Sequence, residues 1–262
     1  MAAMISLVQL AYTSNFDYAS LYSKLDGAKY HLSNDTSNEL AMMPLLGRLL
    51  HHESPEKMTS VVLLGCGTCA ALPKLHGLTQ GHSYGMEVSA NAVKIATALG
   101  RGTECKQPPC LRMGSLLDIP WGDRALDIAV SSDVLEHIHP MDVDRSIAEI
   151  TRITKHILLL GIATGPSVRQ GTELHLTRRN QAWWTKKFED AGWISVEISA
   201  AIWKSLWNKP TSPRLWNYQG RICTDPNADV ANNPKGCNCF FALARTQEDA
   251  SALKAAASRL HP

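Results

Sequence analysis

The chain has 262 residues, of which 45% are hydrophobic and 19% charged, a composition typical of a globular protein and too apolar for a disordered one. Its 26 Lys and Arg nearly balance its 24 Asp and Glu, leaving a formal charge of +2. This balance lacks the basic excess of proteins that bind nucleic acid by neutralising phosphates. We therefore expect one large domain with additions and no nucleic-acid partner.

Two further features of the sequence indicate where in the cell the protein is located. The first 16 residues lack the basic segment of a signal peptide and the length of a membrane span. The seven cysteines are odd in number and irregularly spaced, unlike a disulfide framework. We predict a cytoplasmic protein with reduced thiols and no membrane association, and the sequence gives no indication of oligomeric state.

In chain order, the first predicted element is a helix over 38–51, kinked near Pro44, within a helical cap over 1–59. From Val61 onward short apolar runs alternate with amphipathic segments, which is typical of a parallel sheet covered on both faces. The predicted strands span 60–65, 83–87, 110–113, 126–131, 156–162, 193–199 and 239–244.

Two of the amphipathic segments are predicted crossover helices, because their apolar residues recur at helical spacing. The first follows Ser89, a predicted N-cap, and ends at Gly100. The second covers 141–154. These elements predict an α/β protein with a doubly wound, mostly parallel, seven-stranded sheet. Its parts are the cap (1–59), a cofactor-binding core (60–199), an insertion or lid (200–236), and a last strand with a C-terminal helix (237–262).

The strongest candidate site is a glycine-rich turn between the first strand and the helix after it. Gly65 and Gly67 lack side chains, so the backbone can turn sharply and a ligand can approach the amides at the helix start. The second strand ends at Glu87, whose carboxylate can accept hydrogen bonds from ribose hydroxyls. The turn and the acid together predict an adenosine-containing ligand.

The motif by itself leaves two enzyme classes open, because Gly65, Gly67 and Ala70 also spell the G-x-G-x-x-A fingerprint of dinucleotide-binding proteins. Three features weigh against a nicotinamide-dependent oxidoreductase. They are the helical cap before the first strand, the segment SLLDIPWGDRALDIAVSSDVLEHI at 115–138, and the segment LHLTRRNQAWWTKKFEDAGW at 174–193.

Over 61–199 the chain resembles the class I S-adenosylmethionine-dependent methyltransferases, especially their small-molecule branch. Besides the turn and Glu87, the resemblance is carried by Gly114, Ser115, Ile119, Pro120, Leu126, Asp127, Leu135, Glu136 and His137. It implies S-adenosylmethionine as cofactor and methyl transfer to a small-molecule acceptor by in-line displacement. Other expectations left open are the oxidoreductase and a non-catalytic methyltransferase-like domain that binds a partner through the insertion.

The resemblance also implies which residues bind the cofactor: the methionine part by the turn, the ribose by Glu87, the adenine by the segment after the third strand, and the sulfonium above the end of the fourth. The implied residues are Gly65, Cys66, Gly67, Glu87, Val88, Ser115, Leu116, Ser132 and Asp133. The chain departs from the family pattern at Leu63, Cys69 and Ser115, and each departure removes a polar contact or adds a side chain near the turn.

Asp133, Glu136 and His137 are spaced to share one face of a helical turn. Their order resembles the E-x-x-E-H metal site of a minority of the family. Most relatives use this turn without a metal, so we expect none here. His175, just after the fifth strand, and His137 are the candidate bases for an acceptor that arrives protonated.

All tryptophans except Trp121 lie between Trp183 and Trp216. Within the insertion, Trp203, Trp207, Trp216 and Tyr218 are a candidate lid over the acceptor. The sequence around the end of the fourth strand lacks the motifs of the amino-methylating and cytosine-5 DNA methyltransferases, which leaves a small molecule as the expected acceptor.

Overall fold

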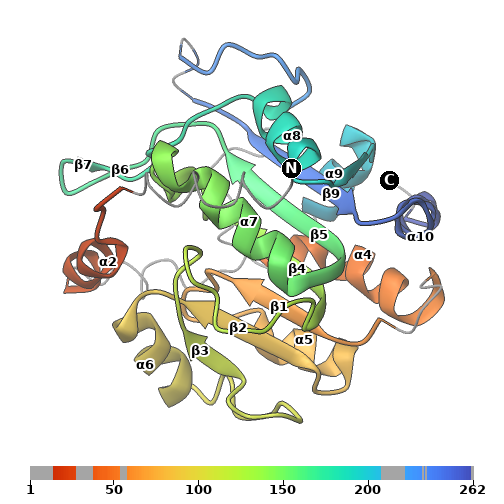
Figure 1. Cartoon of the computed structure of the whole chain (residues 1–262), viewed down its shortest axis with the longest axis horizontal. Helices are drawn as coiled ribbons and strands as arrows, with labels where there is room; N and C mark the ends of the chain where they lie inside the picture. The colour runs from red at the N-terminus through yellow and green to blue at the C-terminus, as the bar shows by residue number, and fades with distance from the viewer. Residues whose placement is uncertain are drawn as a thin grey trace, which may run out of the picture.

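The computed structural model describes residues 14–27, 38–53, 58–207, 222–231, 233 and 235–260. A seven-stranded sheet in the order β3-β2-β1-β4-β5-β9-β8 forms its centre (Figure 1). Strands β1 to β5 pair in parallel, whereas β9 runs antiparallel to both of its neighbours. The strands are β1 (Val61–Leu64), β2 (Ser83–Glu87), β3 (Leu111–Met113), β4 (Leu126–Ser132), β5 (Thr154–Ala163), β8 (Ile194–Val196) and β9 (Asn238–Ala244).

The structure confirms all seven predicted strands and the doubly wound sheet. A second, two-stranded sheet was missed: β6 (Val168–Arg169) and β7 (Thr172–Glu173), joined by a tight turn in which Gln170 and Gly171 have positive φ. Two-residue strands are too short to show an alternating pattern, so sequence periodicity could not reveal them.

Helices cover both faces of the large sheet. Val61 and Leu63 face one hydrophobic cluster, and Val62 and Leu64 face another, because successive side chains of a strand point to opposite faces. The first cluster includes residues of α4 (Met43–Arg48), α5 (Leu72–Thr79), α9 (Ala200–Trp207) and α10 (Gln247–Ser258). The second includes α7 (Val143–Ile153), seen in front of the sheet in Figure 1, and α8 (Gln181–Asp190).

The predicted helix signals are also present. The Ser89 side chain accepts a hydrogen bond of 3.1 Å from the amide of Ala92, which caps α6 (Ala90–Ala98). Gly100 follows with φ of 70°, a left-handed conformation that suits glycine at a helix end. The local sequence therefore sets both ends of this crossover helix.

The segment before β1 holds α2 (Tyr18–Gly27), a 3-10 turn (Asn38–Met42), α4 (Met43–Arg48) and a π-helical turn (Leu49–Glu53). The last three occupy the predicted helix over 38–51. Pro44 lies in the first turn of α4, where its missing amide hydrogen costs no helical bond, so the break falls where the proline predicts it. Leu45, Leu46 and Leu49 are fully buried against the sheet.

The prediction of reduced thiols is wrong. The sulfur atoms of six cysteines lie at bonding distance in three pairs: Cys66–Cys69, Cys105–Cys110 and Cys223–Cys237. Cys239 is a buried free thiol. The irregular spacing of the cysteines argues against a disulfide framework, but turns bring the first two pairs together, and the loop that leads to β9 brings the third pair together. Within the described part of the chain, no helix combines the length and apolarity needed to cross a bilayer.

Trp203, one of the residues of the predicted lid, belongs to the hydrophobic core instead. Trp203, on α9, is 5% exposed and stacks on Phe240 of β9 with ring centroids 5.0 Å apart. It packs in the hydrophobic cluster on this face of the sheet and leaves almost no exposed surface for an acceptor. The side chain of Trp207 and the residues Trp216 and Tyr218 lie outside the described residues, so the remainder of the predicted lid stays a prediction.

Candidate functional site

The glycine-rich turn directly follows β1 and is held against the end of β2. The amides of Gly65 and Cys66 donate to the carbonyl of Met86 at 2.8 and 3.0 Å. Gly65 and Gly67 have positive φ, of 71° and 52°. A Cβ on Gly65 would lie 2.5 Å from a methyl carbon of Val134, so a side chain at this position is excluded both by backbone conformation and by space.

The two cysteines of the turn form a disulfide, contrary to the prediction of reduced thiols. Cys66 and Cys69 are 7% and 1% exposed, and a Cβ on Gly85 of β2 would lie 2.9 and 3.2 Å from their sulfurs. The absence of a side chain at Gly85 thus makes room for the disulfide beneath the turn. A covalent link across the turn, rather than a third glycine, restricts its conformations.

Glu87 connects the turn to the end of β2. One carboxylate oxygen accepts a hydrogen bond of 2.8 Å from the amide of Gly67, and the other accepts bonds of 2.9 Å from the amides of Val88 and Ser89. The side chain is 5% exposed. A carboxylate has about four acceptor positions, so the oxygen that faces Gly67 keeps one for a further donor.

The segment after β3 lies next to Glu87. The amide of Gly114 donates to the carbonyl of Glu87 at 3.1 Å, and Ser115 opens a turn closed by a bond from the amide of Asp118. Leu116 is buried and Ser115 partly exposed. The ends of β1, β2 and β3 therefore bring together the residues that the sequence assigned to cofactor binding.

The end of β4 supplies the fourth predicted group. The Ser131 hydroxyl donates to the Leu64 carbonyl at 3.0 Å, which ties β4 to the residue before the turn. Ser132 donates to the Asp133 carboxylate at 3.2 Å, and Asp133 has φ of 55°, an unusual conformation for a residue with a side chain. Strained backbone of this kind at the carboxyl end of a parallel sheet is common in functional sites.

Beyond Asp133 the chain forms a 3-10 turn, Leu135–His137, with Glu136 and His137 buried. The expected partnership of these two residues with Asp133 is only partly realised. Their ligand atoms gather with the imidazole of His175, all within 4.8 Å of one another. The rings of His137 and His175 meet edge to face with centroids 4.6 Å apart. His175, on a loop in the sequence prediction, is 3% exposed.

Burial shifts the pKa of all three groups toward the neutral form. Burial, reinforced by the charge of Asp133, holds the pKa of Glu136 well above its usual range. Burial and the neighbouring His175 hold the pKa of His137 well below its usual range. Burial also lowers the pKa of His175. Both imidazoles are therefore uncharged at neutral pH.

Sequence reasoning missed the residues that support this cluster. The Tyr22 hydroxyl lies 2.8 Å from Nδ1 of His137, and the carbonyl of Gly165 lies 2.6 Å from Nδ1 of His175. Tyr22 belongs to α2 and Gly165 to the loop after β5. No local motif marks either residue, because each contact joins segments that are far apart in the chain.

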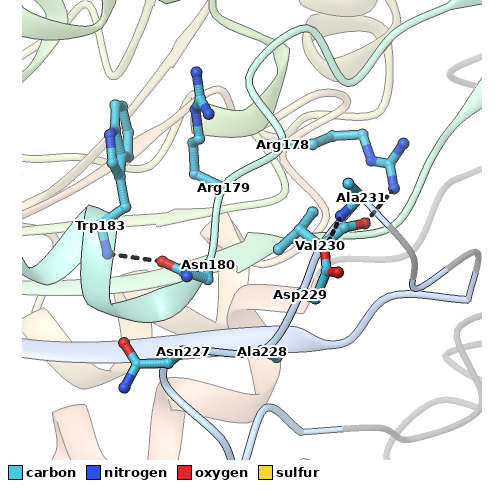
Figure 2. Close-up of a pocket in the computed structure, with 9 residues that line it drawn as sticks. All are labelled: Arg178, Arg179, Asn180, Trp183, Asn227, Ala228, Asp229, Val230 and Ala231. Atoms are coloured by element: carbon cyan, nitrogen blue, oxygen red, sulfur yellow. Dashed lines mark hydrogen bonds between the residues drawn. The ribbon is translucent and has the colours of Figure 1, made fainter.

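Figure 2 shows a separate pocket of about 410 Å³ at the start of α8. It is lined by Arg178, Arg179, Asn180, Trp183 and residues 227–231. Arg178 donates to the carbonyls of Thr164 and Val230, at 3.1 and 3.2 Å, so it anchors the loop before β9. Asn180 caps α8 by accepting from the amide of Trp183 at 3.0 Å. These side chains already have structural partners, and none is a predicted site residue.

A comparison with protein families matches residues 62–157 to the model described as a methyltransferase domain. Among curated proteins, ajmaline N-methyltransferase of Rauvolfia serpentina is 30% identical over 105 residues, which cover 38% of this chain and 34% of that enzyme. The match thus spans about a third of the relative's length.

Solved structures share the fold. A methyltransferase from Aquifex aeolicus superposes with a TM-score of 0.50 at 14% identity, over 83% of this chain and 98% of that one. Magnesium protoporphyrin IX methyltransferase from Synechocystis, solved with bound SAH, superposes with a TM-score of 0.50 at 13% identity, over 94% and 95% of the two chains. At these identities the likeness concerns the fold alone.

Proposed function

We propose that the chain is a class I S-adenosylmethionine-dependent methyltransferase, because its residues 62–157 match the model of a methyltransferase domain, and that it transfers a methyl group from S-adenosylmethionine to a small-molecule acceptor. The observation that carries the proposal is the adjacency of three strand ends: the strained turn at Gly65, the carboxylate of Glu87 and the turn at Ser115. Ligands of open α/β sheets bind at this edge.

In the proposed complex, the methionine part lies on the backbone of Gly65, Cys66 and Gly67. The free acceptor position of Glu87 receives a ribose hydroxyl, with Val88 beside it. Ser115 and Leu116 contact the adenine, and Ser132 and Asp133 lie beneath the sulfonium. These are the residues that the family resemblance implies, and together they form the proposed binding surface.

Methyl transfer from a sulfonium is an in-line displacement, so the main task of the protein is to hold the acceptor atom against the methyl carbon. An acceptor that arrives protonated also needs a base. His137 and His175 are proposed for this role because burial lowers the pKa of each imidazole and keeps it neutral, and a neutral imidazole can accept a proton.

A small molecule is the proposed acceptor for two reasons. The curated relative is named for the N-methylation of ajmaline, and the near-neutral composition of this chain does not favour a nucleic acid.

We further propose that 1–262 forms one domain. The prediction of a cytoplasmic location rested on the N-terminal sequence and on reduced thiols. The second ground no longer holds, because disulfides such as the three seen here persist mainly in oxidising compartments.

Ligand binding tests the proposal. The full chain is titrated with S-adenosylmethionine, S-adenosylhomocysteine and NADH while its melting temperature is followed. We expect both sulfur nucleosides to raise it by mass action and NADH to leave it unchanged. 2′,3′-Dideoxy analogues of S-adenosylhomocysteine should bind more weakly, because Glu87 then loses its ribose partner. Stabilisation by NADH favours an oxidoreductase, and no stabilisation by any of these ligands favours a non-catalytic domain.

Incubation with S-adenosylmethionine and a panel of amine and hydroxyl metabolites, followed by mass analysis for a gain of one methyl group, then identifies the acceptor. Binding without any methylated product in the panel would place the acceptor outside those two chemical classes.

A further inference from the structure

Three buried side chains converge behind the end of β4. Glu136 and His137 lie on the 3-10 turn after this strand, and His175 comes from the segment after β7. They are 0%, 8% and 3% exposed, and each directs one ligand atom to a common centre, with all three atoms within 4.8 Å of one another.

The acceptor atoms in this cluster face one another. Nδ1 of His175 lies 2.6 Å from the Gly165 carbonyl, which can only accept, so this nitrogen carries the proton and Nε2 presents a lone pair. Nε2 lies 4.0 Å from one carboxylate oxygen of Glu136, too far for a direct hydrogen bond. The other oxygen of Glu136 is fully buried and has no hydrogen-bond partner.

A buried carboxylate oxygen without a partner is costly, and the carboxylate of Glu136 has one oxygen within 4.8 Å of a ring nitrogen of His137 and of His175. A cation at the common centre would satisfy all of these groups. Glu136 also accepts a bond of 3.0 Å from the amide of Ala163 through its first oxygen, which fixes the carboxylate in place.

We infer that Glu136, His137 and His175 form a binding site for a divalent transition-metal ion, represented by Zn²⁺. One carboxylate and two imidazoles form a three-ligand set that suits Zn²⁺ and neighbouring transition metals, whereas Mg²⁺ and Ca²⁺ prefer oxygen ligands alone. This inference does not depend on the proposed methyl transfer, but it excludes the base role proposed above for His137 and His175, because a bound ion occupies the imidazole lone pairs that would accept the proton.

The outer contacts match those of metal-bound histidines, whose second nitrogen bonds to a carbonyl, a carboxylate or another polar group. Gly165 supplies this contact to His175, and Tyr22 to His137. The backbone of Leu174 also favours the protonated form of His137 and opposes the lowering of its pKa, and a bound ion would have to displace this interaction. Tetrahedral ligands bonded at about 2.0–2.1 Å lie roughly 3.3 Å apart, so the three ligand atoms must move closer together on binding.

The test is a titration of the full chain, first treated with chelator and dialysed, with Zn²⁺, Co²⁺ and Mg²⁺. We expect one equivalent of Zn²⁺ to bind, Co²⁺ to show the visible absorption of a site with nitrogen ligands, and Mg²⁺ not to compete. Zn²⁺ should also raise the melting temperature of the wild-type chain, a readout that needs no variant.

Variants locate the site. Glu136→Gln and His175→Asn should each weaken Zn²⁺ binding by more than about 100-fold, because changes to outer partners alone cost 10–100-fold. Tyr22→Phe, which changes an outer partner of His137, should weaken Zn²⁺ binding by about 10–100-fold. His82→Asn, a histidine outside the cluster, is the matched control for adventitious binding and should leave the affinity unchanged. Circular dichroism identifies any variant that fails to fold.

The inference is overturned if the wild-type chain binds no stoichiometric Zn²⁺ or Co²⁺. It is equally overturned if the folded Glu136→Gln and His175→Asn variants bind as the His82→Asn control does, or if Mg²⁺ displaces Zn²⁺.

Discussion

At the scale of single residues, Asp127 shows how one buried carboxylate organises the start of the sheet. Its oxygens accept bonds from the amides of Thr59 and Ser60 at 2.9 Å, from the Ser60 hydroxyl at 2.8 Å and from the ammonium of Lys155 at 3.0 Å. Burial would raise the pKa of Asp127, but these donors outweigh it and hold the pKa below its usual value. One side chain thus joins β1, β4 and β5.

We expect Asp127→Asn to lower the free energy of unfolding by about 1–3 kcal/mol at pH 7, because an amide cannot satisfy all four donors. Since the folded pKa is lowered, the stabilisation by Asp127 is present above its unfolded pKa of about 3.9 and is lost as pH falls through the folded value. Urea unfolding at pH 7 and pH 3 measures both effects. Asp190→Asn, which removes an exposed ion pair with Lys186, is the control and should cost less than about 1 kcal/mol.

Gly65 gives a second prediction at this scale. Gly65→Ala should abolish the melting-temperature shift caused by S-adenosylhomocysteine, because the new methyl group would displace Val134 and strain the turn. Gly77→Ala, on α5, has no atom within 4 Å of the added carbon and should keep the full shift. A Gly65→Ala chain that binds as the wild type does would show that the turn is not the cofactor site.

At the scale of elements, the docking of α2 depends on Asp142, which is fully buried at the start of α7. Asp142 accepts a bond of 2.8 Å from the amide of Ser14 and another of 2.8 Å from the Tyr18 hydroxyl. The same hydroxyl accepts from the amide of His139 at 2.8 Å. This network places α2, and with it Tyr22, against the cluster of Glu136, His137 and His175.

Tyr18→Phe should therefore destabilise the protein by about 1–3 kcal/mol, because it leaves the Asp142 carboxylate and the His139 amide short of a partner. Faster hydrogen exchange confined to α2 and to the segment around His139 is the expected pattern in mass spectrometry. Uniformly faster exchange across the sheet would instead mean that the network stabilises the whole fold rather than the docking of α2.

At the scale of the whole molecule, the disulfides mark which parts of the chain are fixed by covalent links. Cys66–Cys69 lies within the candidate cofactor turn, Cys105–Cys110 before β3, and Cys223–Cys237 across the loop that leads to β9. The last pair closes a loop with a sequence separation of 14 residues, for which loop-closure entropy gives a stabilisation of about 3 kcal/mol.

Protein purified without reductant and denatured should contain one reactive thiol, Cys239, and seven after reduction. Thiol titration and peptide mapping measure both numbers. Cys223→Ser combined with Cys237→Ser should lower the stability by about 3 kcal/mol. Seven reactive thiols before reduction would contradict the pairing and restore the original ground for a cytoplasmic location.

Much of the fold could be predicted from the sequence. Buried strands such as β1 and β5 contain short apolar runs, and Ser89 and Gly100 mark helix ends through local backbone chemistry. Alternation of such strands with helices leaves few arrangements other than a doubly wound sheet. The two-residue strands β6 and β7 are too short for a periodic pattern, and the core role of Trp203 depends on Phe240, a distant partner.

The sequence by itself determined the seven strands, the glycine turn and the acid at the end of β2, because each depends on residues that are neighbours in the chain. Only the tertiary structure decided that His175, rather than Asp133, joins Glu136 and His137, that Tyr22 supports them, and that six cysteines pair. The physical reason is that metal ligands, outer hydrogen bonds and disulfides depend on distances across the fold, which the spacing of residues along the chain does not specify.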